Sequence, residues 1–150
     1  MSTRSFIARK TDTGYEGVYC HWDGYPEHNG AVLQTHYSDP GKIAYLLSFG
    51  DISSLGPEIG SDHSFDDRPE GATTFYGRDR GETGRHTVPA EFAFDCDVLD
   101  RAASMGCEFV YIFKEKRWFY CERGPQFFGC DDGSAFSELK PLEQVISQTK

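Results

Sequence analysis

Strand-like runs lie near both ends of the chain, and helical patterns lie between them. Residues 6–8 and 17–21 predict a hairpin at the N-terminal end. Residues 109–113 and 118–122, which are rich in aromatic side chains, predict a second hairpin toward the C-terminal end. This arrangement is typical of the α+β class, so we predict an antiparallel sheet of about four to five strands with three to four short helices.

The clearest helix signal begins at Pro40. Asp39 can cap free backbone N–H groups, Pro40 suits the first helical position, and Gly50 stands where a left-handed C-terminal residue is expected. Apolar spacing predicts further helices over residues 31–37 and 95–105.

The length of 150 residues fits a single domain spanning 1–150. Only 38% of the residues are hydrophobic, but the chain has 12 Phe, 8 Tyr and 2 Trp, and large rings bury much area each. From Asp51 to about Ala72 the chain is rich in Gly, Pro, Ser, Asp and Glu. So long a connection is usually functional or mobile.

The formal net charge of −9 disfavours direct nucleic-acid binding and contact with anionic membranes, whereas it suits a basic partner protein. The five cysteines are an odd number without a Cys-x-x-Cys spacing, so neither a disulfide framework nor a zinc knuckle is indicated. The apolar stretch near the N-terminus is too short for a signal peptide or a spanning helix. We therefore expect a soluble cytoplasmic protein.

A first candidate site is the segment from His21 to His28, where two histidines, two carboxylates and two large aromatics occur within eight residues. Imidazole titrates near neutrality, and a neighbouring carboxylate can orient it. In the structural alternative, the aromatics are core anchors and His21 is hydrogen-bonded beside them. Metal binding is a weaker alternative because no ligand spacing is recognisable, so we assign no metal and no cofactor. The candidate ligand-binding residues here are His21, Trp22, Asp23 and Tyr25.

A second candidate site is the glycine-flanked loop that contains Arg78, Asp79 and Arg80. Two arginines on a permissive backbone offer paired donors to a phosphate or carboxylate. In the alternative, the arginines form a salt-bridge network with Asp79, Glu82 or other acids. The loop is not a P-loop, and we assign no catalytic residue in the chain.

Four segments carry a family resemblance: 1–5, 19–26, 50–56 and 76–81, which read MSTRS, YCHWDGYP, GDISSLG and YGRDRG. In this order they resemble a group of small uncharacterised proteins encoded by tailed phages, prophages and other mobile elements of bacteria. The resemblance covers roughly residues 1–82. It implies a phage or mobile-element setting, and hence the host bacterial cytoplasm, but no catalytic role.

The leading hypothesis is a non-enzymatic accessory protein that counters a bacterial defence system, which makes it an anti-CRISPR candidate among others. It would block a host defence protein or sequester a nucleotide-like ligand, with homo-oligomerisation left open. The alternative is a small hydrolase of a phosphorylated molecule, with His21 as base and Arg78 or Arg80 as phosphate clamp. If the protein is an enzyme, His21 should lie near a carboxylate in an open cleft. If it sequesters a ligand, it should have a pocket lined by arginine side chains. If it blocks a host protein, it should have a contiguous acidic face.

Overall fold

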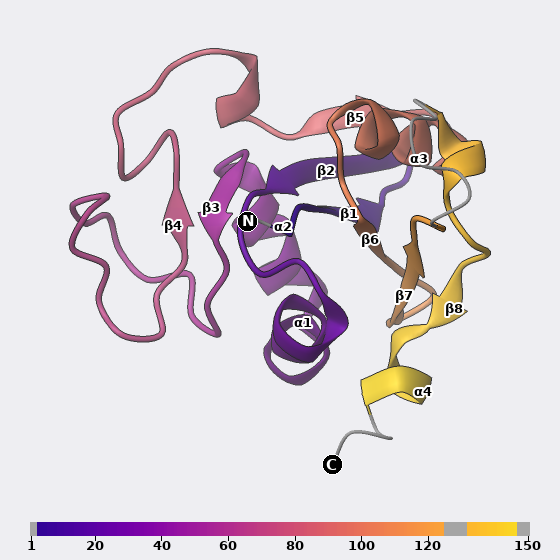
Figure 1. The fold of residues 1–150 in the computed structure, drawn as a ribbon. Helices are drawn as coiled ribbons and strands as arrows, with labels where there is room; N and C mark the ends of the chain where they lie inside the picture. Colours follow the sequence, from indigo (N-terminus) through magenta and orange to yellow (C-terminus); the bar gives the residue numbers. More distant parts are fainter. Residues whose placement is uncertain (1–2, 125–131, 147–150) are drawn as a thin grey trace.

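The computed structural model describes residues 3–124 and 132–146, in which a mixed sheet carries helices on both faces (Figure 1). Its strands are β1 (Ser5–Lys10), β2 (Tyr15–Cys20), β3 (Ile52–Ser54), β4 (Thr74–Phe75), β5 (Ala90–Phe92), β6 (Phe109–Lys114), β7 (Arg117–Glu122) and β8 (Lys140–Pro141). Its α-helices are α1 (Ala31–His36), α2 (Pro40–Ser48), α3 (Asp95–Ser104) and α4 (Leu142–Ile146). Within these ranges, no helix combines the length and apolarity that crossing a membrane requires.

The strand order is β4-β3-β2-β1-β6-β7-β8, and β5 also pairs with β2. Both predicted hairpins are present, as β1–β2 and β6–β7. The α+β class is therefore confirmed, but the described sheet has eight strands and is mixed, because β1 runs parallel to β6 and β2 runs parallel to β3. The strand predicted over residues 73–76 is present as β4, whereas β3, β5 and β8 have only two or three residues and are too short to show a period-two pattern.

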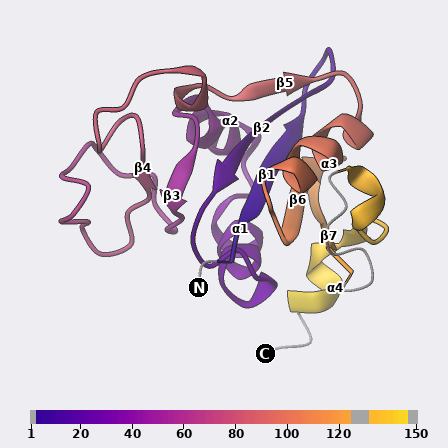
Figure 2. The ribbon, with the colours of Figure 1, turned by 45° about the horizontal axis from the view of Figure 1, so that its top comes forward.

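Two apolar clusters fill the two faces of the sheet. On one face, α1 and α2 bury Leu33, Tyr37, Ile43 and Leu47 against strand residues that include Ile7. On the other, α3 packs against residues of β1, β2, β6 and β7. Figure 2 shows α3 lying over the β1–β6 part of the sheet, away from β3 and β4. On this face, α3 therefore does not cover β3 and β4.

The signals that predicted α2 are seen in its structure. The Asp39 carboxylate accepts a hydrogen bond from the Lys42 N–H at 3.1 Å, and Gly50 has φ of 78° after the helix end. A Cβ atom at Gly50 would lie 2.4 Å from the His86 carbonyl oxygen. Glycine is thus required both by the left-handed backbone and by the close approach of the His86 segment.

The C-terminal hairpin turns through Glu115 and Lys116, whose φ values are 54° and 64°. Positive φ at both central residues is the type I′ geometry that matches the twist of paired strands. Trp118 follows in β7 and is 3% exposed, and its indole N–H donates to the Tyr37 carbonyl at 2.8 Å. Its ring also packs edge-to-face on Phe113, with the centroids 5.2 Å apart. Through the Trp118 side chain, the hairpin is therefore packed and hydrogen-bonded against the end of α1, on the side of the sheet that α1 and α2 cover.

We predict that Trp118→Ala lowers the free energy of unfolding by about 3–5 kcal/mol, because it removes a buried aromatic and leaves the Tyr37 carbonyl unpaired. Trp22→Ala is the matched control: Trp22 is 44% exposed, and its removal should cost less than about 1 kcal/mol. Urea denaturation of both variants checks this. Equal midpoints for Trp118→Ala and the wild type would contradict it.

Candidate functional site

The residues predicted near His21 lie at the end of β2. A hydrogen bond of 2.7 Å joins the Tyr19 hydroxyl to His21 Nδ1, and the Trp22 ring meets the imidazole edge-to-face at 4.7 Å. Burial and the positive charge of Arg4 lower the pKa of His21. The Tyr25 hydroxyl donates to Asp23 at 3.3 Å. The hydrogen-bond partner of the His21 imidazole is therefore the Tyr19 hydroxyl. Among the described residues, no carboxylate hydrogen-bonds to the imidazole.

Arg78 uses its guanidinium inside the protein. Its Nε and one Nη donate to the two carboxylate oxygens of Asp79 at 2.9 and 3.1 Å. The other N–H groups donate to the carbonyls of Ile59, Gly60 and Thr73. These five hydrogen bonds match the five donors of a guanidinium. Arg78 thus connects the long 55–72 segment to the end of β4 and has no described donor left for a ligand.

Asp79 is the buried counterpart of this arginine. Its carboxylate accepts the backbone N–H groups of Phe75 at 2.8 Å and His63 at 3.0 Å. Although burial opposes ionisation, the hydrogen bond from Arg78 and these N–H groups hold the pKa of Asp79 below its ordinary value. Arg80 differs: its side chain is 56% exposed and pairs with Glu82 at 3.3 Å. No hydrogen bond or ion pair among the described residues joins this loop to the His21 group.

We predict opposite outcomes for the two arginines. Arg78→Ala should lower the free energy of unfolding by about 3–5 kcal/mol, because Asp79 then remains as a buried, unpaired charge. Arg80→Ala should change it by less than about 0.5 kcal/mol, because surface ion pairs contribute little. Thermal or urea unfolding of the two variants measures this directly. An unchanged stability for Arg78→Ala would show that its hydrogen bonds are dispensable to the fold.

The edge of β2 that faces away from β1 is shared by two diverging strands. β5 pairs with residues 15–17, and β3 pairs at Cys20. Between them, the Tyr19 N–H donates to the Asp51 carboxylate at 3.0 Å instead of to a strand carbonyl. The Asp51 N–H in turn donates to the His86 carbonyl at 2.7 Å. Asp51 is therefore fixed at the point where the two strands separate.

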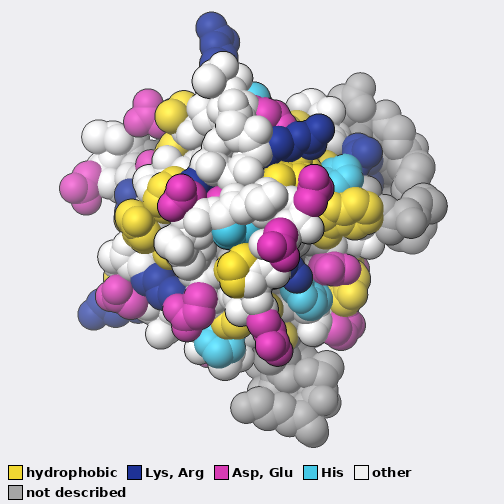
Figure 3. Space-filling view, turned by 90° about the vertical axis from the view of Figure 1, so that its left-hand side faces the viewer, with side chains coloured by type: hydrophobic (Ala, Val, Ile, Leu, Met, Phe, Trp, Pro, Cys, Tyr) yellow, Lys and Arg dark blue, Asp and Glu magenta, His cyan; other side chains and the backbone are white. Residues whose placement is uncertain are grey.

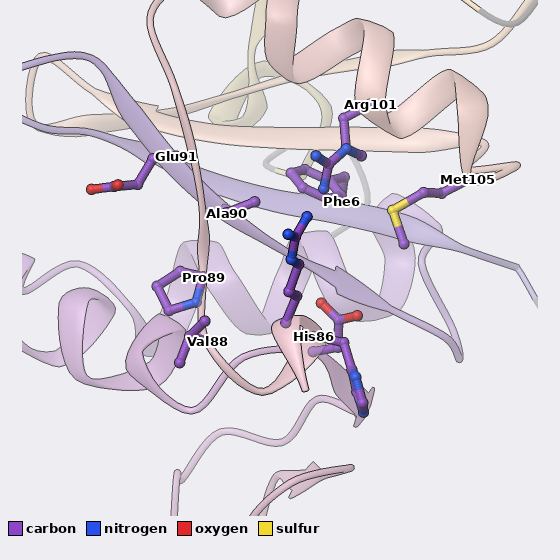
Figure 4. Close-up of a pocket in the computed structure, with 11 residues that line it drawn as sticks. Phe6, His86, Val88, Pro89, Ala90, Glu91, Arg101 and Met105 are labelled. Carbon is purple, nitrogen blue, oxygen red and sulfur yellow. The ribbon is translucent and has the colours of Figure 1, made fainter. Parts of the chain in front are cut away.

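A cavity of about 460 Å³ opens at this point (Figure 4). Its volume falls within the range of about 300–1,000 Å³ that is typical of small-molecule sites. Phe6 and Gly17 contribute from β1 and β2, and a Cβ atom at Gly17 would lie 2.6 Å from the Phe6 ring. Val88 and Pro89 line it from the loop before β5, and Met105 from the end of α3. These residues make much of the cavity wall apolar.

Two arginines face the same cavity from different elements. Arg85 belongs to the 3-10 turn Arg85–Thr87, and Arg101 extends into the cavity from α3 (Figure 4). Arg101 packs against the Phe92 ring, 5.4 Å from its centroid. In the described part of the chain, neither guanidinium makes a side-chain hydrogen bond or an ion pair, in contrast to Arg78 and Arg80. Unpaired, convergent guanidinium groups are suited to binding an anion.

The Asp51 carboxylate also lines this cavity. Burial raises the pKa of Asp51 above its ordinary value, and the Tyr19 N–H and the charges of His86 and Arg101 oppose that rise. The imidazole of His86 is itself hydrogen-bonded to Glu82 at 2.9 Å. The cavity thus combines cationic groups with an acid whose ionisation is disfavoured.

The raised pKa of Asp51 makes the fold less stable as the pH rises. Between the ordinary carboxyl pKa and the higher value in the folded protein, the folded state binds more protons than the unfolded state. We predict that Asp51→Asn removes this pH-dependent loss of stability, because the amide does not titrate. The amide oxygen can still accept the hydrogen bond from the Tyr19 N–H. The difference in melting temperature between the variant and the wild type should therefore rise as the pH increases from the ordinary carboxyl pKa through the higher pKa of Asp51 in the folded protein. A pH-independent difference would contradict the prediction.

Comparisons of the chain with protein-family models, with curated proteins and with solved structures give no match. Across residues 3–124 and 132–146, no three His, Cys, Asp or Glu side chains are grouped to hold a metal ion. The cavity depends instead on Asp51, Arg85 and Arg101. Arg85 and Arg101 lie outside every motif singled out in the sequence, whereas Asp51 lies within the segment 50–56 that carries the resemblance. The one local signal is the acid directly after the helix-ending Gly50.

Proposed function

We propose that this protein is a phage or mobile-element accessory protein that binds a small anionic ligand of the nucleotide type without catalysis and thereby counters a bacterial defence system. The setting rests on the resemblance of residues 1–82 to small phage and mobile-element proteins. The observation that supports ligand binding is the pair of unpaired guanidinium groups, Arg85 and Arg101, at one cavity of about 460 Å³.

Sequestering a ligand is better supported than blocking a host protein through an acidic face. On the side of the molecule in Figure 3, acidic side chains alternate with Lys, Arg, His and apolar side chains. A contiguous acidic patch is what a basic partner would require. On this side of the molecule, the acidic side chains are therefore dispersed and form no contiguous acidic surface.

The hydrolase hypothesis has one observation in its favour. The lowered pKa of His21 favours the neutral imidazole that a general base requires. However, His21 is hydrogen-bonded to the Tyr19 hydroxyl. The five donors of Arg78 bind groups of the protein itself, and Arg80 pairs with Glu82. A base oriented by a carboxylate and a free phosphate clamp are thus not assembled by these residues, and we favour binding without catalysis.

The test is native mass spectrometry of the protein purified from bacterial cells. We expect a bound small molecule on the wild type that is reduced about tenfold or more in Arg85→Gln and in Arg101→Gln, because each removes charged hydrogen bonds to the ligand. Each change should cost less than about 1 kcal/mol of stability, since neither guanidinium has a described hydrogen-bond partner and Arg101 loses only its packing on Phe92. Arg80→Gln is the control, because Arg80 is exposed and pairs with Glu82 outside the cavity.

Equal retention of the small molecule by the wild type and by both cavity variants would contradict the proposal, as would a wild-type protein without any bound small molecule. A host protein retained in its place would instead support the blocking hypothesis. A phage that expresses the wild-type protein should infect bacteria that carry the defence system, whereas a phage that expresses Arg101→Gln should not. This result would connect the cavity to the biological effect.

A further inference from the structure

The Asp51 carboxylate is not what an anion-binding cavity alone would contain. Its charge repels a phosphate or carboxylate ligand, and its burial disfavours ionisation. Oδ1 accepts one N–H, from Tyr19, and each carboxylate oxygen has capacity for more. Among the described residues, no ion pair neutralises Asp51, although His86 and Arg101 are close enough to lower its pKa. A ligand that suits this acid must supply hydrogen-bond donors to it.

The apolar residues of the cavity wall indicate a second property of the ligand. Phe6, Val88, Pro89 and Met105 line the same cavity as the two arginines. Figure 4 shows Arg101 extending from α3 toward the Phe6 ring, with Val88 and Pro89 on the opposite side. Such a wall favours a flat ring system that gains from stacking and from leaving water. The cavity therefore combines sites for an anion, for N–H donors and for an apolar ring face.

We infer that the ligand is a guanine-type nucleotide, with its base edge on Asp51 and its phosphate on Arg85 and Arg101. This inference rests on the proposed function and specifies its ligand class. Guanine presents a ring N–H and an amino N–H side by side, and a carboxylate can accept both. Adenine presents an amino N–H beside a ring nitrogen lone pair, which would face a carboxylate oxygen unfavourably. Asp51 is then the specificity-determining residue of the cavity.

The test is isothermal titration calorimetry with guanosine monophosphate, adenosine monophosphate and ribose 5-phosphate. We expect the wild type to bind guanosine monophosphate about tenfold or more tightly than adenosine monophosphate. Asp51→Asn keeps an acceptor for the Tyr19 N–H but turns the other oxygen into a donor. It should weaken guanosine monophosphate about tenfold or more and leave ribose 5-phosphate unchanged or tighter. Asp67→Asn, which removes the same charge at an exposed position outside the cavity, is the matched control and should preserve the preference.

Different results of this titration would overturn the guanine preference and the proposed ligand-binding function. Equal affinity of the wild type for the two nucleotides, with no effect of Asp51→Asn, overturns the inference and leaves an anion-binding cavity. No binding of any of the three probes to the wild type overturns the proposed function and this inference together. The preference of the wild type needs no variant, so the test stands even where Asp51→Asn fails to fold.

Discussion

The hydrogen bond from the Tyr19 N–H to the Asp51 carboxylate replaces a strand pairing at the centre of the sheet. Because β3 and β5 share one edge of β2 and diverge from it, the backbone between residues 17 and 20 would otherwise lack a partner there. Asp51 satisfies that N–H and is itself held by the His86 carbonyl. The divergence of the strands, the cavity that it opens and the position of the acid in it therefore have one common cause.

The arginines of the chain divide into two groups by what their donors contact. Arg78 is internal and fully hydrogen-bonded, and with Asp79 it fixes the long segment that precedes β4. Arg85 and Arg101 face the cavity, and no described carboxylate pairs with them. In a chain with an excess of acids, unpaired cations that converge on one cavity indicate a ligand more strongly than paired ones.

Local signals predicted the parts of the fold that depend on neighbours in sequence. Asp39, Pro40 and Gly50 predicted α2 because capping and a left-handed helix end are properties of single residues. The aromatic hairpin was predictable for the same reason, although its type I′ turn uses Glu115 and Lys116 rather than Asn and Gly. The parallel β1–β6 pairing was not predictable in this way, because about a hundred residues separate its strands.

The sequence by itself determined the fold class, the principal helices and hairpins, and the presence of histidine and arginine at two candidate loops. Only the tertiary structure decided which charged side chains have partners. It places Arg78 of the predicted loop in a buried network, and it brings Arg85 and Arg101, which the sequence did not single out, to a cavity with Asp51. The physical reason is that a helix cap acts over a few residues, whereas a binding cavity is formed by side chains that meet only when strands distant in sequence share one edge of a sheet.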